Sequence, residues 1–249
     1  MKRVLLSVMT IVAAGFSVTA QAADMAVTPE TSEAGQHVSV FTGVDFTSIG
    51  SYTGFAGATI APVGKLDESG LRIGLFGAAG SYKYDTTIEG PTTVKGTFAV
   101  GDVLLGYGVA HDNWNAKFYA GLSIQDHSLS PVDPNNPVQG AKAGLKVQGD
   151  IWINPTAQTM VLGLASFSTV FNSYYATVKT GYDVFGKQIF IGPEAIAQGN
   201  DRYAQLGVGA HISGIKLGKN AELGFSAGYL QSSDVGSGAY AQANLRFGF

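Results

Sequence analysis

Residues 239–249, Ala-Tyr-Ala-Gln-Ala-Asn-Leu-Arg-Phe-Gly-Phe, alternate in character along their whole length. One face of this stretch carries only Ala, Leu and Phe, while the other carries Tyr240, Gln242, Asn244, Arg246 and Gly248. Successive side chains of a β-strand point to opposite faces, whereas an amphipathic helix needs apolar residues at spacings of three and four. The segment is therefore predicted to be a strand with one apolar and one polar face.

The same alternation recurs along the chain, for example at 115–125 and 141–153. Strands are expected to begin near His37, Tyr52, Leu71, Thr97, Asn115, Ala141, Ala157, Tyr174, Gln188, Arg202, Ala221 and Gly238. Segments of about ten residues suit a tilted bilayer crossing, whereas the strands of soluble proteins average about five or six. The longest connections, at 83–94 and 127–139, alternate with short turns. The pattern predicts an all-β fold, a closed antiparallel up-and-down transmembrane β-barrel of about 12 strands, within a range of about 10–14.

Composition supports this prediction and excludes several classes of protein. Charged residues make up 13% of the 249 residues, about half of the roughly 25% that is usual in soluble domains. The 34 glycines are dispersed among β-branched and aromatic residues, so neither a collagen-like nor a disordered chain fits. The absence of cysteine excludes a disulfide scaffold and thiolate metal sites. Because the formal net charge is −3 and no basic patch is present, nucleic acid is not an expected partner.

The N-terminus has the features of an export signal. A basic start at Lys2 and Arg3 precedes an apolar run over residues 4–18, and Ala20-Gln21-Ala22 matches the small-residue pattern of a cleavage site. The apolar run is shorter than the roughly 20 residues that a spanning helix requires. We therefore predict a cleaved signal peptide at 1–22, a short extension at 23–36, and a single barrel domain at 37–249 located in the outer membrane.

The two faces of the strands predict which side of the barrel meets lipid. The apolar face is rich in small and aliphatic residues, as expected of lipid contact, while the other face collects the charges. A secreted β-sandwich and a soluble barrel with an apolar centre are the alternatives. In a membrane barrel, charged side chains are expected to pair within a narrow lumen. The expected network contains Lys142, Lys146, Asp150, Lys179, Asp183, Glu194, His211, Glu222 and Arg246, and Arg72 and Lys117 share its face.

Aromatic residues fall into two groups. Those near the predicted strand ends are expected to form girdles at the membrane interfaces; they are Trp114, Tyr174, Tyr182, Phe225, Tyr229, Phe247 and Phe249. Others share the inward face, where flat rings can stack on the sugar rings of a glycan. The candidates for glycan contact are Tyr119, Trp152, Tyr175, Tyr203 and Tyr240. A second interpretation stays open, in which these rings simply fill the lumen.

The last third of the chain contains a series of short motifs: Gly192-Pro193-Glu194-Ala195, Gly199-Asn200-Asp201-Arg202-Tyr203 and Leu206-Gly207-Val208-Gly209-Ala210-His211. Gly214, Gly228-Tyr229 and Gly238-Ala239-Tyr240 follow them. This series resembles the cellulose biosynthesis protein BcsS family. The resemblance implies an outer-membrane barrel that is associated with bacterial cellulose production, in a family without a settled biochemical activity.

No sequence pattern indicates catalysis or metal binding. The four histidines, His37, His111, His127 and His211, lie far apart and without the spacing of metal ligands. The trio 126–128, Asp-His-Ser, does not suit a catalytic triad because consecutive strand residues point to opposite sides. The glycine pairs at 106/108 and 207/209 lie within strands, where glycine relieves crowding. We therefore expect no enzymatic activity, no metal and no cofactor.

Together these observations predict an accessory barrel of cellulose biosynthesis or export. Its expected partners are outer-membrane lipid and either a cellulose chain or other components of cellulose synthesis, and its oligomeric state stays open. One alternative is a general small channel or a structural barrel unrelated to cellulose. Another is an outer-membrane enzyme acting on lipid or glycan, for which Glu194 and His211 are the candidate residues.

Overall fold

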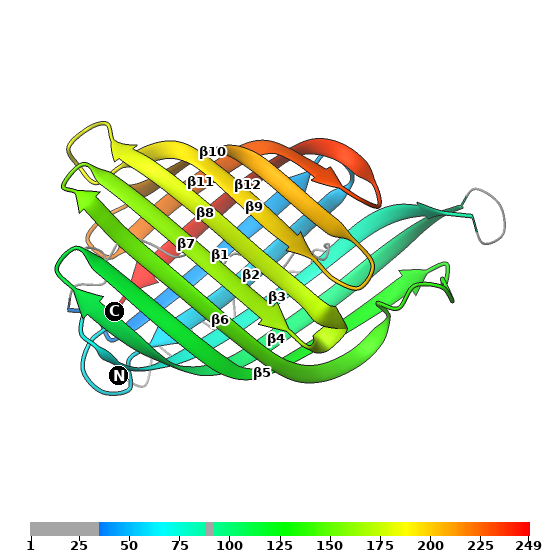
Figure 1. The fold of residues 1–249 in the computed structure, drawn as a ribbon, viewed down its shortest axis with the longest axis horizontal. Coiled ribbons are helices and arrows are strands. Elements are labelled where there is room, and N and C mark those ends of the chain that lie inside the picture. The colour runs from blue at the N-terminus through cyan, green and yellow to red at the C-terminus, as the bar shows by residue number, and fades with distance from the viewer. Residues whose placement is uncertain (1–34, 88–91) are drawn as a thin grey trace.

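The computed structural model describes residues 35–87 and 92–249, which form a closed antiparallel β-barrel (Figure 1). The strands are β1 (Val38–Thr47), β2 (Ser51–Ile60), β3 (Gly70–Thr86), β4 (Thr92–His111), β5 (Trp114–Ser130), β6 (Gly140–Thr156), β7 (Thr159–Ser168), β8 (Ser173–Asp183), β9 (Phe190–Gly199), β10 (Ala204–Lys216), β11 (Ala221–Ser232) and β12 (Gly236–Gly248). Each strand pairs with its neighbours in sequence, and β1 pairs with β12 to close the sheet. The predicted fold class is therefore confirmed.

The predicted signal peptide and nearly all of the predicted extension lie outside the described residues. A 3₁₀ turn at Val170–Asn172 joins β7 to β8. In the described part of the chain, no helix has the length and apolar character needed to cross a membrane.

The barrel has two distinct ends. The end with the first residues of β1 and the last of β12, on the left of Figure 1, we call the terminal end; its connections are 61–69, 112–113, 157–158, 184–189 and 217–220. The opposite end, which we call the hairpin end, carries the connections 48–50, 131–139, 169–172, 200–203 and 233–235. There the β3–β4 hairpin projects beyond the other strands (Figure 1).

Strand starts agree with the predicted ones to within two residues, with one exception. The alternation predicts a start near Thr97, but β4 begins at Thr92, and β3 continues to Thr86. The prediction that 83–94 is a long connection is therefore wrong over most of its length. The cause is continued pairing beyond the barrel: Tyr84 and Val94 lie opposite each other in the hairpin, and both are buried.

The outer surface of the wall is apolar. Phe118, Leu122 and Leu206 are 64%, 66% and 67% exposed, while the adjacent Lys117 and Ser123 point inward and are buried. A soluble barrel would show the reverse arrangement, because its apolar face would form the centre. The apolar face thus meets the surroundings and the charged face is enclosed, as in a barrel that spans a bilayer.

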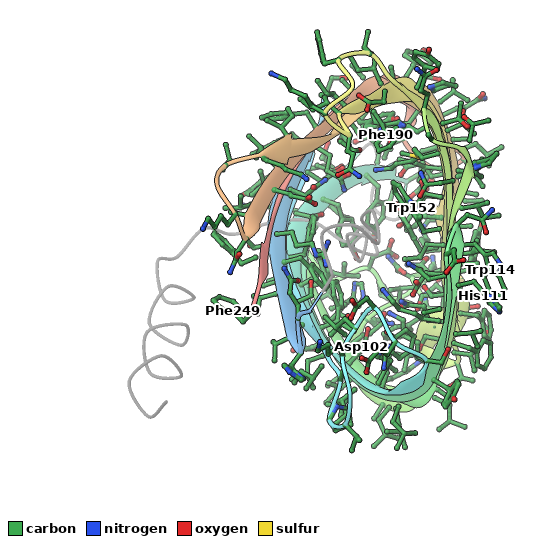
Figure 2. The ribbon with its side chains drawn as sticks, turned by 90° about the vertical axis from the view of Figure 1, so that its left-hand side faces the viewer. Asp102, His111, Trp114, Trp152, Phe190 and Phe249 are labelled. Carbon is green, nitrogen blue, oxygen red and sulfur yellow. The ribbon has the colours of Figure 1, made fainter. Side chains whose placement is uncertain are left out.

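Aromatic rings lie near the strand ends on this outer surface. Trp114 stacks on His111 with 4.7 Å between ring centroids, and both lie outside the wall (Figure 2). Tyr182, Tyr229 and Phe249 are at least half exposed. These positions are those expected of residues at a membrane–water interface.

The interior is not uniformly polar. A cluster of buried side chains, which we call the apolar layer, links the walls from β1 to β8 and contains Phe41, Phe55, Phe76, Ala78, Phe98, Leu104, Tyr119, Leu164 and Tyr175. Glycines make room for these rings, since a Cβ at Gly57 would overlap Phe41 and one at Gly43 would overlap Phe55. Viewed along its length, the barrel is oval and side chains occupy its interior (Figure 2). A narrow barrel of this kind can be packed by side chains rather than left as a pore.

An arginine in place of Leu122, in the middle of β5, tests whether this surface meets lipid. A charged side chain at the bilayer midplane of a membrane barrel costs about 2–4 kcal/mol, so Leu122→Arg should lower the unfolding free energy by roughly that amount. Urea unfolding of the barrel in lipid vesicles measures the change, and Leu122→Ala is the matched control. Equal stability of the arginine and alanine variants would mean that this surface faces water.

Candidate functional site

Four strands contribute to a polar cluster inside the barrel, centred on Glu194 of β9. The Nζ atom of Lys179 lies 3.2 Å from Glu194 Oε2, and the Ser226 hydroxyl donates a hydrogen bond to the same oxygen at 2.8 Å. The Tyr240 hydroxyl donates to Glu194 Oε1 at 2.5 Å. All four side chains are buried. We call these residues the Glu194 cluster, and in it both carboxylate oxygens are engaged.

The Tyr240 side chain reaches this cluster by lying flat against the wall. It starts on β12 and crosses β11 and β10 before its hydroxyl meets Glu194 on β9. Glycines line this path, because a Cβ at Gly228 or Gly209 would overlap the tyrosine side chain. The sequence predicts that glycines within strands relieve crowding. Here they leave room for the Tyr240 ring, which lies across two neighbouring strands.

Pro193 interrupts the hydrogen-bond ladder between β8 and β9. The pairing stops after Lys179 and Glu194 and resumes at Tyr182 in the same register, which places Pro193 opposite Thr180. Proline has no N–H group, so it cannot donate to a neighbouring strand. The Thr180 carbonyl oxygen must therefore find another donor in the wall of the barrel.

His211 of β10 supplies that donor. Its Nε2 atom lies 3.1 Å from the Thr180 carbonyl oxygen, and because a carbonyl only accepts, Nε2 carries the proton. The Nδ1 atom of the neutral ring then accepts from the Ser213 hydroxyl at 2.9 Å. Gly192 lies opposite His211 in the pairing of β9 with β10, and a Cβ there would overlap the Thr180 carbonyl group. The Gly-Pro pair and the histidine therefore act as one structural unit.

The other predicted charges occupy separate places along the interior. Arg246 Nε donates to Ser39 Oγ at 2.7 Å, and Arg246 Nη1 lies 3.8 Å from Glu222 Oε2. Asp150 lies opposite Lys117 in the pairing of β6 with β5.

The remaining predicted charges lie at different depths. Asp183 is at the terminal end, Lys142 is at the hairpin end, and Lys146 is further along β6 inside the lumen. Asp183 accepts backbone hydrogen bonds from the turn 184–189, the shortest at 2.8 Å from Gln188. Lys142 is exposed, with its Nζ 4.4 Å from the Phe171 ring centroid at the hairpin end. Lys146 Nζ lies 2.5 Å from Asp102, an acid that sequence reasoning missed although its inward position on β4 follows from the alternation.

Four of the five aromatic candidates for glycan contact are packed inside the wall. Trp152 is 0% exposed, lies edge-on to Phe190 at 5.9 Å, and donates its Nε1 proton to Asn154 at 2.7 Å (Figure 2). Tyr119 and Tyr175 belong to the apolar layer, and Tyr240 belongs to the Glu194 cluster. Tyr203 differs, because it lies in the connection 200–203 and borders open space.

At the terminal end, the connection 61–69 folds back onto a buried arginine. Arg72 is 1% exposed, and its guanidinium group donates to the carbonyl oxygens of Lys65, Leu66 and Glu68. Leu66 is buried as a result of this folding. The connection is long for a turn at this end, and its carbonyl oxygens satisfy the donors of the buried arginine.

The terminal end also holds a polar pocket, which Gln36, Lys216, Glu222 and Arg246 line among others. The hairpin end holds two adjoining pockets. One pocket is lined by Tyr82, Tyr84, Arg202, Tyr203 and Asp234 among others. A second pocket, which shares Tyr203 and Asn200 with the first, is lined by Phe76, Phe98, His127 and Lys146 among others. We call the two together the vestibule. Its floor is the apolar layer, because Phe76 and Phe98 belong to both.

The polar groups of the vestibule were mostly missed by sequence reasoning. Arg202 Nη2 lies 3.0 Å from Asp234 Oδ1, and its guanidinium group lies 5.0 Å from the Tyr84 ring centroid. Burial raises the pKa of the Asp234 carboxyl group, although the charge of Arg202 opposes that rise. His127 is 3% exposed and packs between Phe98 and Phe171. Arg202 and Asp234 come from two connections, Tyr84 from β3 and His127 from β5, so only the folded chain brings these groups together. Within residues 35–87 and 92–249, no group of three His, Asp or Glu side chains could hold a metal ion.

Solved structures with the same type of fold are outer-membrane proteins. The TodX deltaS2S3 mutant, a monoaromatic hydrocarbon channel, superposes with a TM-score of 0.52 at 10% identity, over 94% of this chain and 96% of TodX. The KdgM porin in complex with oligogalacturonate has a TM-score of 0.47 at 12% identity, over 85% of this chain and 99% of the porin. LpxR from Salmonella typhimurium has a TM-score of 0.48 at 12% identity, over 85% of this chain and 100% of LpxR. Such identities concern the fold alone, and no curated protein matches the sequence.

The family comparison covers the barrel itself. The sequence profile of the family described as cellulose biosynthesis protein BcsS matches residues 39–249, from the start of β1 to the last residue. The motifs that resemble this family contribute Glu194 and Tyr240 to the Glu194 cluster, Pro193 and His211 to the structural unit beside it, and the glycines that accommodate Tyr240. The motif 199–203 lies at the vestibule. The chain is thus a cellulose-related barrel of the outer-membrane type, and it belongs to the cellulose biosynthesis protein BcsS family.

Proposed function

We propose that this protein is a non-catalytic accessory barrel of bacterial cellulose production, which sits in the outer membrane and anchors the producing assembly or its polymer there. The single observation that carries the proposal is the apolar layer, in which buried side chains from seven strands, β1–β5, β7 and β8, pack together inside the lumen. A barrel filled in this way suits attachment at the membrane better than passage of a polymer through its centre.

The closed interior argues against a glucan conduit. A path for a polysaccharide needs ring faces that sugar can reach and polar groups that can exchange partners. Trp152 is 0% exposed and Tyr119 is 2% exposed, so neither ring offers a face to a passing chain. At the terminal end, the connection 61–69 is held in place by its bonds to Arg72.

The occupied polar groups also favour a non-catalytic role. A general acid or base must reach the substrate atom whose proton it transfers. Glu194 accepts from Tyr240 and Ser226 and contacts Lys179, while both ring nitrogens of His211 are engaged within the wall. The two residues favoured by the enzyme alternative therefore have structural partners.

The proposed orientation places the terminal end in the periplasm and the hairpin end outside the cell. In bacterial outer-membrane barrels both ends of the chain face the periplasm and the longer extensions face outward. Here both chain ends lie at the terminal end, while the β3–β4 hairpin projects from the opposite end (Figure 1). Because the sequence contains no cysteine, single cysteines can report this arrangement without background.

Cysteines at the two ends should be labelled differently in whole cells. Val132, which is 70% exposed in the connection 131–139, and Lys219, in the connection 217–220, supply the two positions. A membrane-impermeant maleimide should label Val132→Cys in intact cells and Lys219→Cys only after the outer membrane is permeabilised. The opposite pattern would refute the orientation, and absence of the protein from the outer-membrane fraction would refute the location.

A filled lumen should conduct poorly, which separates an anchor from a general channel. Purified protein in planar bilayers is expected to pass little current. Phe41 and Phe76 stack in the apolar layer with 6.5 Å between centroids, so Phe41→Ala/Phe76→Ala should raise the conductance. Phe46→Ala, which removes an outward ring from the same strand β1, is the control. Steady open-channel currents from the unmodified protein would favour the channel alternative.

Loss of the gene should lower extracellular cellulose under producing conditions, and unchanged output would contradict the accessory role.

Complementation of the deletion with variants then distinguishes an accessory barrel from an enzyme. Lys179→Met/Glu194→Gln removes both charges of the pair and keeps its shape, so this variant should restore output as fully as the unmodified gene. His211→Asn is expected to do the same if the barrel folds. A folded variant that fails to restore output would support the enzyme alternative.

A further inference from the structure

The vestibule combines ring surfaces with hydrogen-bonding groups. Its outer part is bordered by Tyr82 and Tyr203, with Ile49 and Val235 completing an apolar wall. Its inner part adds three serine residues, at 166, 168 and 173, and the amide of Gln125. Ligand sites of this kind are concave and mainly apolar, with a few polar groups that fix orientation.

Two buried polar atoms of the vestibule still lack a partner among the described residues. His127 is 3% exposed, yet its Nε2 atom has no hydrogen-bond partner, and the residue lines the inner pocket. Arg202 Nε, at the outer pocket, is likewise buried without an acceptor. An unsatisfied buried polar group costs free energy, so a ligand hydroxyl group would be favoured at these places.

The charges of the vestibule indicate an uncharged ligand. Lys146 is paired with Asp102, and Arg202 is paired with Asp234. Lys83 lines the outer pocket as an exposed residue at its rim. The paired cations are therefore already neutralised, which leaves ring faces, hydroxyl groups and amides as the recognition chemistry.

From these observations we infer that the vestibule binds the end of a neutral β-linked glucan, with sugar rings against Tyr203 and Tyr82 and hydroxyl groups near His127 and Arg202. Phe76 and Phe98 of the apolar layer line the inner part of the vestibule, and on this basis the site is inferred to hold a chain end without threading it. The inference rests on the proposed function, which supplies the glucan, and it adds a location and a chemistry for the contact.

Binding of cellohexaose to the full-length mature barrel tests this inference. Isothermal titration is performed in a detergent without a sugar headgroup, since alkyl glucosides would compete. Tyr203→Ala should weaken cellohexaose binding by at least about tenfold, the effect of losing one main contact residue. His127→Phe keeps an aromatic ring between Phe98 and Phe171 but loses both nitrogens, and it should also weaken binding. Tyr229→Ala, on the outer surface, is the matched control and should bind normally.

The outcomes separate this inference from the proposed function. The vestibule is not the site if the unmodified barrel does not bind cellohexaose. It is also not the site if the Tyr203 and His127 variants bind as tightly as the unmodified barrel while their heat-dependent mobility on gels shows that they are folded. Equal affinity for maltohexaose overturns the preference for a β-linked chain. Loss of cellulose output on gene deletion without cellohexaose binding refutes only the vestibule, whereas cellohexaose binding with unchanged output refutes only the accessory role.

Discussion

The structure depends on closing the backbone hydrogen-bond ladder around a ring. Within hydrocarbon there is no water to satisfy peptide groups, so a sheet can cross a membrane only when its first and last strands pair. Here β1 and β12 do so over nine residue pairs, from Ser39–Gly248 to Thr47–Tyr240. Beyond that pairing, the N–H groups of His37 and Val38 both donate to the carbonyl oxygen of Phe249, which ties down the last residue.

Closure also explains why a proline in the wall needs compensation. Pro193 removes a donor from the middle of the sheet, where a free carbonyl would otherwise lie in the wall. A histidine from the next strand replaces the donor from inside the lumen, and a glycine opens the space for it. The net value of such a bond is only about 1 kcal/mol, but an unsatisfied buried carbonyl costs more than the bond returns. The conspicuous Gly-Pro and histidine of the sequence can therefore be explained by the wall alone, without catalysis.

The period of two made most of the wall predictable, because it is a local property of each strand. It correctly separated the apolar exterior, as at Leu122, from enclosed charges such as Glu194. It also led to a wrong boundary at 83–94, because alternation does not reveal that two strands continue to pair after they leave the barrel. Contacts across several strands could not be predicted. Tyr240 meets Glu194 only because of the barrel's register and the glycines between them.

The packing of side chains inside the barrel could not be predicted for a similar reason. Alternation assigns a face to each residue, but it does not tell whether inward rings from distant strands meet. Phe41 and Phe76 do meet, and with their neighbours they form an apolar layer between two unlike ends. At the terminal end a buried arginine holds the connection 61–69, beside a polar pocket that Glu222 and Arg246 line; at the hairpin end, tyrosines and hydrogen-bonding groups surround the vestibule. A uniform pore would need no such difference, whereas a barrel that attaches something at one face of a membrane requires a recognition surface at that end. The distribution of apolar side chains along the lumen is therefore the strongest physical argument for binding over transport.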